Sequence, residues 1–215
     1  MKCLYQFDVQ QLNNLIEKEL LLGHWLIRDD KIKNRTDSIL CSDRFTQIKR
    51  QADRNGISYN DLEVVTWFDT LKTMYTTFSR IEDEDLKNNI IIFQEFCIPY
   101  SNKRADYILV YDNKMLIVEF SFNKLRYEFN YETKLQQAIG YKELLSNILP
   151  KEIDIGTYTF LLEPEEDGRG KAFFIEGTQY LSNHYNINDF AQYIEKFFKK
   201  NLYLAYNSIV NLDED

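Results

Sequence analysis

Residues 90–122 read IIIFQEFCIPYSNKRADYILVYDNKMLIVEFSF and contain three extended segments in succession. The segments Ile90–Ile98, Arg104–Tyr111 and Lys114–Phe122 are rich in β-branched and aromatic residues, which favour strands. Short turns separate the segments, so each lies close enough along the chain to pair with the next. The sequence therefore predicts a three-stranded meander.

Helical spacing of apolar residues is typical of much of the flanking sequence. The resulting order of helices, three strands, helix, two strands and helix predicts an α/β (α+β) fold without an internal repeat. The acidic run Glu82–Asp85 fits either a solvated loop or the start of a helix. Outside the meander we expect helices over residues 8–23, 43–54, 60–75, 132–149 and 189–202, and strands over residues 157–162 and 171–176.

The composition is that of one globular domain, or of one domain with a small extension, because 44% of the 215 residues are hydrophobic and 28% are charged. Fifteen Tyr and fifteen Phe beside seven Gly exclude collagen-like, linker-like and disordered classes. The longest nearly apolar stretch, Leu20–Ile27, is too short to span a bilayer, and the N-terminus is not a secretory signal. Three widely spaced cysteines favour reduced thiols. We therefore expect a cytoplasmic protein that does not associate with membranes.

The net charge of −8 is unevenly distributed along the chain. Residues 26–54 carry eight Lys or Arg against five Asp or Glu, and residues 101–151 carry eight against six. Residues 152–215 carry five against twelve. This pattern is compatible with a local surface that faces phosphates, but an ordinary solvated surface of mixed charge explains it as well.

Three carboxylates occupy the meander at Glu95, Asp106 and Glu119. Alternation along a strand places Glu119 and Ser121 on one face of the third segment, which otherwise has the apolar composition of a buried strand. A buried carboxylate without a partner costs several kcal/mol, so Glu119 needs one. A divalent cation shared with Asp106 would suffice, and oxygen ligands of this kind select Mg²⁺ or Mn²⁺.

These residues resemble the motifs of the PD-(D/E)xK nuclease superfamily. Glu95 is similar to the upstream acid of that family, Asp106 to the Asp of its second motif, and Glu119 to the acidic member of its ExK. The segment Gln137–Tyr141 is similar to the Gln-x-x-x-Tyr signature of the RecB-like branch. The resemblance covers about residues 60–176.

The resemblance implies a restriction-endonuclease-like αβββαβ core. It implies a nuclease-like domain over residues 59–215, including a C-terminal helix, behind an N-terminal helical extension over residues 1–58. It also implies that Asp106, Glu119 and the main-chain carbonyl of Phe120 hold the metal, with Glu95 as an outer or second-metal ligand. Gln137 and Tyr141 would orient the site or contact the nucleic-acid backbone.

One departure from the family concerns its lysine, because Ser121 stands two residues after Glu119 where the ExK lysine is expected. A serine hydroxyl cannot neutralise charge on a phosphate. Lys134 is the best relocated candidate, because positions 134, 137 and 141 lie on one face of a helix. Lys124 is the second choice, since its odd offset from Glu119 directs it to the other face unless the strand ends or bulges first.

We therefore expect a Mg²⁺-dependent or Mn²⁺-dependent nuclease that hydrolyses DNA, rather than RNA, in restriction, repair or defence. A catalytically degenerate fold that binds nucleic acid or a protein partner is the alternative, and a protein-interaction subunit is a third hypothesis. A homodimer is compatible with each. The enzyme is favoured if an ammonium group lies within about 5 Å of the Asp106 and Glu119 carboxylates, the range over which charges alter each other's ionisation.

Each candidate also has a purely structural interpretation. Glu95 fits a cross-strand ion pair with Arg104, and Asp106 fits a cap of the turn before its strand. Gln137 and Tyr141 fit a pair on a helix surface, and Lys134 fits a solvated helix lysine.

Overall fold

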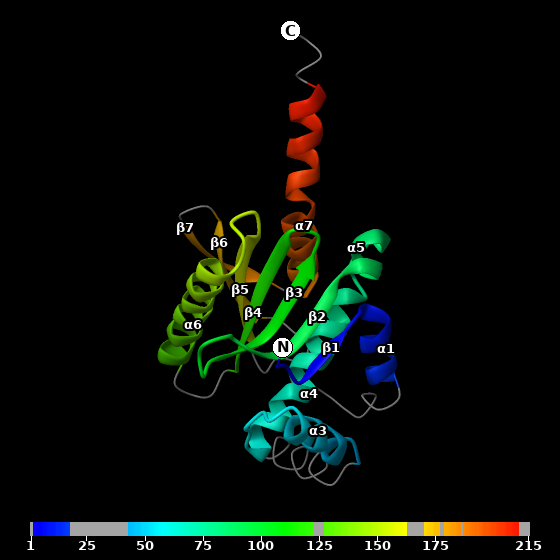
Figure 1. Cartoon of the computed structure of the whole chain (residues 1–215), viewed down its shortest axis with the longest axis vertical. Helices are drawn as coiled ribbons and strands as arrows, with labels where there is room; N and C mark the ends of the chain where they lie inside the picture. The colour runs from blue at the N-terminus through cyan, green and yellow to red at the C-terminus, as the bar shows by residue number, and fades with distance from the viewer. Residues whose placement is uncertain are drawn as a thin grey trace.

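The computed structural model describes residues 2–17, 43–122, 127–162, 170–176, 179–185 and 187–210. Figure 1 shows a mixed sheet with helices on both of its faces, which is an α+β architecture and confirms the predicted fold class. The elements are β1 (Tyr5–Phe7), α1 (Val9–Glu17), α3 (Asp43–Arg54), α4 (Asp61–Phe78), α5 (Glu84–Asn89), β2 (Ile91–Cys97), β3 (Arg104–Tyr111), β4 (Lys114–Phe122), α6 (Tyr127–Ile148), β5 (Asp154–Leu162), β6 (Gly170–Glu176), β7 (Gln179–Tyr185) and α7 (Ile187–Val210).

Within the described residues, seven strands form one sheet in the order β1-β2-β3-β4-β5-β6-β7. All neighbours are antiparallel except β4 and β5, which run parallel because α6 returns the chain to the same end of the sheet. The predicted meander is confirmed as β2, β3 and β4. From α4 to β5 the chain also contains the predicted succession of helix, three strands, helix and strand, with α5 inserted before β2.

Two strands were not expected from the sequence. β1 has only three residues, too few to show an alternating pattern, and it pairs with the outer edge of β2. β7 forms the opposite edge by pairing with β6. Both are edge strands, and their assignment depends on a neighbouring strand rather than on a pattern of their own.

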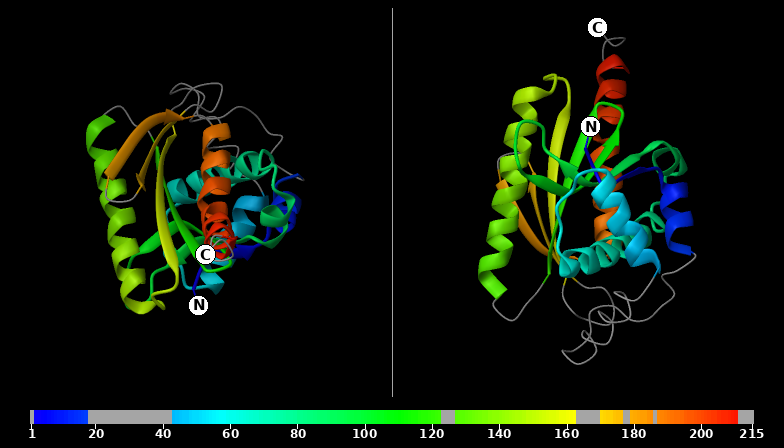
Figure 2. Two further views of the ribbon diagram at one scale, coloured as in Figure 1. Left: turned by 90° about the horizontal axis from the view of Figure 1, so that it is seen from above. Right: turned by 60° about the horizontal axis from the view of Figure 1, so that its bottom comes forward.

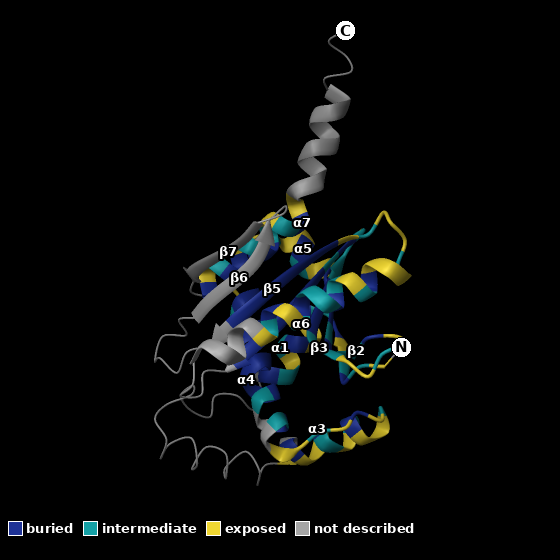
Figure 3. Ribbon diagram, turned by 90° about the vertical axis from the view of Figure 1, so that its left-hand side faces the viewer, coloured by how far each residue is buried: buried dark blue, intermediate teal, exposed yellow. Residues whose placement is uncertain are grey.

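Helices cover the two faces of the sheet (Figure 2), with α6 on one face and α4 and α7 on the other. Leu116, Val118 and Phe120 of β4 point into the larger core with α4 and α7. Ile117, on the opposite face of β4, packs with Tyr141 and Leu145 of α6. Figure 3 shows that burial follows this layering, with buried residues in the sheet and exposed residues on the outer sides of α3 and α6.

The N-terminal segment packs against the same cores. Val9, Leu12 and Ile16 of α1 contact Leu71 and Met74 of α4 in the larger core. A third cluster joins α3 to the N-terminal half of α4. The predicted helix over residues 8–23 is observed as far as Glu17, and its remainder lies outside the described residues. The predicted boundary after residue 58 stays a prediction.

Helix boundaries follow their capping residues. The side chain of Asn60 accepts a hydrogen bond from the Glu63 N–H and starts α4. Asp83 accepts from the Leu86 N–H in the same way, so the acidic run begins a helix, α5, and is not only a loop. The helices expected over residues 132–149 and 189–202 are longer in the structure, at 127–148 and 187–210. Among the described helices, none combines the length and apolarity needed to cross a membrane.

The close approach of α7 to β5 at Gly156 predicts a large packing effect. A Cβ atom at this position would lie 2.5 Å from Phe197 Cε2 and 2.8 Å from its Cζ, so we expect Gly156→Ala to lower the free energy of unfolding by about 1–3 kcal/mol. Gly140 of α6 is the matched control, because a Cβ there meets no heavy atom within 4 Å. Gly140→Ala should stabilise the helix by about 0.5–1 kcal/mol. Urea unfolding of the two variants tests this, and equal effects would contradict the packing argument.

Candidate active site

The three predicted carboxylates come from neighbouring strands at one level of the sheet. Gln94 pairs with Tyr107 and Phe96 with Ala105, which places Glu95 opposite Asp106 across β2 and β3. The next ladder, between β3 and β4, brings Asp106 beside Glu119 in the same way. The structure therefore gathers the acids that the sequence singled out.

Two backbone hydrogen bonds hold Asp106 and Glu119 together. The Asp106 N–H donates to Glu119 Oε1 at 3.0 Å, and the Phe120 N–H donates to Asp106 Oδ2 at 2.8 Å. Asp106 is thus bound to the neighbouring strand, and its expected alternative role as a cap of the preceding turn is wrong. The second oxygen of each carboxylate, Asp106 Oδ1 or Glu119 Oε2, takes no part in these two bonds.

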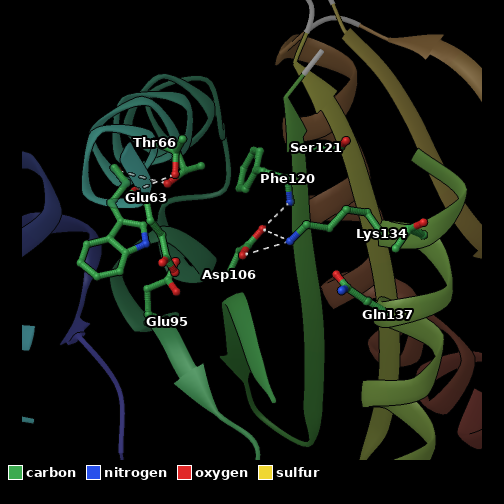
Figure 4. Close-up of a pocket in the computed structure, with 11 residues that line it drawn as sticks. Glu63, Thr66, Glu95, Asp106, Phe120, Ser121, Lys134 and Gln137 are labelled. Atoms are coloured by element: carbon green, nitrogen blue, oxygen red, sulfur yellow. Dashed lines mark hydrogen bonds and ion pairs between the residues drawn. The ribbon is translucent and has the colours of Figure 1, made fainter. Parts of the chain in front are cut away.

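Lys134 of α6 brings its ammonium group to both carboxylates, and Figure 4 shows its contact with Asp106. Its Nζ lies 2.8 Å from Glu119 Oε2 and 3.2 Å from Asp106 Oδ2. These distances are well within the 5 Å criterion stated above. The interpretation of Lys134 as a solvated helix lysine is therefore wrong, because the helix returning from β4 lies directly over the carboxylates and directs this side chain onto them.

Burial and neighbouring charges shift the pKa values of Glu119 and Lys134. Burial of Glu119, together with the negative charge of Asp106, raises the pKa of the Glu119 carboxyl to about 8. Burial lowers the pKa of Lys134, but the charges of Asp106 and Glu119 outweigh this effect and raise it above its ordinary value. The ammonium group therefore stays charged, and the ionised form of Glu119 depends on a neighbouring cation.

Glu95 has an unusual backbone conformation. Its φ is +52°, in the left-handed region, which costs a non-glycine residue about 1–3 kcal/mol. Its side chain is buried and forms an ion pair with the Arg104 guanidinium, so the cross-strand pair considered from the sequence is present. Burial, followed by the charge of Asp106, raises the pKa of Glu95 well above its ordinary value. Glu95 is thus electrostatically part of the site while its carboxylate is bound by Arg104.

Arg104 connects Glu95 to α4, which the sequence did not indicate. Its guanidinium also forms an ion pair with Glu63, donates to the carbonyl of Ser58 at 2.8 Å, and lies 5.7 Å from the centre of the Trp67 ring. Glu63 was missed because an acidic residue in the first turn of a helix is common and carries no signal of a site. Only the packing of α4 against β2 and β3 brings it to the carboxylates.

A pocket of about 320 Å³ opens between α4, the sheet and α6. Gln137 lines this pocket as expected, one turn after Lys134. Tyr141 does not line it, and its expected place on the helix surface is wrong, because the residue is 4% exposed and packs beneath α6 with Ile117. The residues that line the pocket are Glu63, Thr66, Trp67, Thr70, Glu95, Asp106, Phe120, Ser121, Thr133, Lys134 and Gln137.

The other two positions considered for the lysine are Ser121 and Lys124. Ser121 is buried and lines the pocket, so a neutral hydroxyl stands two residues after Glu119. Lys124, the second candidate for a relocated lysine, lies outside the described residues.

The chemistry of the site fits a divalent cation with many water ligands. Among the described residues, no three His, Cys, Asp or Glu side chains are arranged as a ready metal site. Mg²⁺ nevertheless needs only one or two carboxylates besides water and substrate phosphate, which the adjacent Asp106 and Glu119 supply. Among the described residues the charged cluster also has more acids than bases, and a divalent cation would favour the ionised form of the two acids whose pKa burial raises, Glu95 and Glu119. Its acids are Glu63, Glu95, Asp106 and Glu119, and its bases are Arg104 and Lys134.

Comparisons of this chain with protein-family models, with curated proteins and with solved structures found no match. The description of the site therefore rests on its own residues.

The raised pKa of Glu119 predicts how stability depends on pH. The folded state favours the protonated carboxyl, so this contribution to stability is complete below the ordinary pKa near 4.5 and is lost as the pH rises through about 8. We expect Glu119→Gln, which is permanently neutral, to lack this loss. Melting temperatures of the metal-free proteins between pH 5 and pH 8.5 should show the wild type falling relative to the variant. Parallel curves would contradict the assignment.

Proposed function

We propose that this protein is a metal-dependent phosphodiesterase that cleaves DNA, of the restriction, repair or defence type, and that it acts in the cytoplasm. The observation that carries this proposal is the Lys134 ammonium, 2.8 Å from Glu119 and 3.2 Å from Asp106. It supplies the positive charge that is absent at Ser121. Two carboxylates and a lysine are the groups that the chemistry requires, and here they converge from β3, β4 and α6.

Asp106 and Glu119 would hold Mg²⁺ or Mn²⁺, with the carbonyl of Phe120 as a further oxygen ligand. When bound, the metal would activate water and stabilise the negative charge that develops on the phosphate. The hydrogen bonds from the Asp106 and Phe120 N–H groups fix the two carboxylates before metal arrives, which reduces the rearrangement that binding requires.

Lys134 has two roles in this proposal. Without substrate it neutralises Asp106 and Glu119, and with substrate its ammonium binds a non-bridging oxygen of the scissile phosphate. Gln137 lies on the same face of α6 and lines the pocket, where its amide can orient water or the nucleic-acid backbone. Tyr141 is buried, so its role is to hold α6 on the sheet rather than to contact the phosphate.

The direct test is a cleavage assay on single-stranded DNA, double-stranded DNA and RNA with Mg²⁺, Mn²⁺ or EDTA. Metal-dependent cleavage of DNA is expected, and binding of DNA should weaken steeply as salt rises because phosphate contacts release counterions. Salt-dependent binding without cleavage would instead favour the degenerate binding module. The absence of both activities would move weight to a protein partner.

Ser121→Lys tests whether the site already has its ammonium group. Lys134 occupies the position between the carboxylates, so a second lysine on the face of Glu119 should crowd a buried position and raise the cleavage rate little or not at all. A large gain, of about 10²-fold or more, would mean that Lys134 does not perform this role. Initial rates of the two proteins at saturating Mg²⁺ give the comparison.

A further inference from the structure

The four acids of the charged cluster form two pairs, and each pair contacts a different cation. Lys134 contacts the two proposed metal ligands. Arg104 contacts the other two acids, Glu63 of α4 and Glu95 of β2. Figure 4 shows Glu63 and Glu95 on one side of Asp106 and Lys134 on the other. Because Glu63 and Glu95 line the same pocket as Asp106, they raise the question of whether the pocket holds a second metal ion.

The Arg104 guanidinium is fixed by contacts to each of its nitrogen atoms. Its Nε contacts Glu95, its Nη2 contacts Glu63, and its Nη1 donates to the Ser58 carbonyl at 2.8 Å. Its Cζ lies 5.7 Å from the centre of the Trp67 ring, within the range of a cation–π contact. The planar fork of an arginine suits this arrangement, because it directs several N–H groups at once to acceptors from different elements. Arg104 therefore has little freedom to leave the two acids.

The Lys134 ammonium is held differently. It reaches its two carboxylates from the end of a flexible four-carbon side chain, and it lines the pocket. A divalent cation at these carboxylates has to displace a single ammonium group. At Glu63 and Glu95 it would have to break the whole set of Arg104 contacts, or lie beside a fixed positive charge that repels it. The two pairs of acids therefore differ in whether a metal ion can displace their cation.

We propose that Arg104 takes the place of a second metal ion, so that the site holds one divalent cation, at Asp106 and Glu119. This inference rests on the proposed function. It gives Glu95 a role other than that of the outer or second-metal ligand which the family resemblance implies. Glu95 is the partner of Arg104, and through it β2 is joined to Glu63 of α4 at the wall of the pocket. The guanidinium supplies this charge permanently, because arginine does not deprotonate in proteins.

Calorimetric titration with Mn²⁺ counts the bound ions directly. The wild type should bind about one Mn²⁺ per chain, and so should Glu95→Gln. The variant should lose less than about tenfold in Mn²⁺ affinity, which is less than the usual cost of losing even a group that orients a metal ligand. Glutamine keeps the shape of the Glu95 side chain, and Arg104 keeps its contact with Glu63, so this variant should fold.

Arg104→Met removes the guanidinium and keeps a long unbranched side chain. Glu63 and Glu95 then lack their cation, and Mn²⁺ should replace it, which raises the stoichiometry to about two ions per chain. Arg104→Lys keeps a positive charge and should still bind one. Arg80→Met is the matched control, because the Arg80 guanidinium donates to α7 rather than to these acids, and it should also bind one ion. Saturating Mn²⁺ should raise the melting temperature of Arg104→Met more than that of the wild type, a readout that serves even if the metal-free variant is unstable.

One bound ion in the wild type and in Glu95→Gln, with a second ion in Arg104→Met, would support the inference, because a purely structural arginine does not change the number of metal ions. Two ions in the wild type, or a fall of about 10²-fold or more in the affinity of Glu95→Gln, would overturn it while the proposed function stands. A single ion in Arg104→Met, with no extra stabilisation by Mn²⁺, would overturn it as well. If the wild type neither binds Mn²⁺ nor cleaves any nucleic acid, the proposed function fails and the inference falls with it.

Discussion

Replacing Lys134 with alanine is expected to lower the rate of metal-dependent cleavage by about 10²–10³-fold or more, the usual cost of removing a group that stabilises transition-state charge. Among the residues that the structure describes, Lys134 is the cation that contacts both Asp106 and Glu119, and Ser121 cannot replace its charge. Mn²⁺ binding should persist, because the ammonium competes for the same oxygens and its removal leaves them to the metal. Single-turnover cleavage and calorimetry measure the two quantities separately.

Lys142→Ala is the matched control for this variant. Lys142 lies on the same helix, about two turns further along, among residues that do not line the active-site pocket. The Lys142→Ala protein should cleave DNA at the rate of the wild type. Circular dichroism should show that Lys142→Ala and Lys134→Ala both remain folded. Lys134→Arg should keep part of the activity, and added methylamine should restore part of the activity of Lys134→Ala. A fully active Lys134→Ala protein would overturn the relocated-lysine proposal.

Replacing Asp106 with asparagine should have the second large effect, a fall of more than about 10²-fold in Mn²⁺ affinity with loss of cleavage, since it removes the charge of a proposed metal ligand itself. Asparagine keeps the shape of the side chain and an oxygen that can accept from the Phe120 N–H, so the contact between β3 and β4 can persist. The change therefore removes one negative charge from the proposed metal ligands while leaving the fold intact.

Asp112→Asn controls for the loss of a negative charge on the same sheet. Asp112 is exposed in the turn between β3 and β4, and its positive φ of 53° is a conformation that asparagine tolerates. Its Mn²⁺ affinity and cleavage should equal those of the wild type. If Asp106→Asn instead lowers the melting temperature equally with and without Mn²⁺ and leaves affinity unchanged, Asp106 has only a structural role.

The local sequence pattern was sufficient to predict the long helices and the strands that pair with their neighbours in sequence. Runs of β-branched and aromatic residues identified β2, β3 and β4, and apolar spacing identified α4 and α6. The short strand β1 and the acidic start of α5 were missed or left open. Their structure depends on a partner strand and on a single capping contact at Asp83, and neither produces a periodic signal.

The sequence by itself determined that Glu95, Asp106 and Glu119 share one region, because neighbouring strands of a meander bring fixed positions side by side. It left open which cation neutralises them. Helix spacing made Lys134 the first of two candidates, but only the tertiary structure brought its ammonium to the carboxylates, joined Arg104 to Glu63, and removed Tyr141 from the pocket, because each depends on where a helix crosses the sheet. That crossing follows from side-chain packing across the whole layer, whereas residue spacing along one helix shows only which side chains share a face.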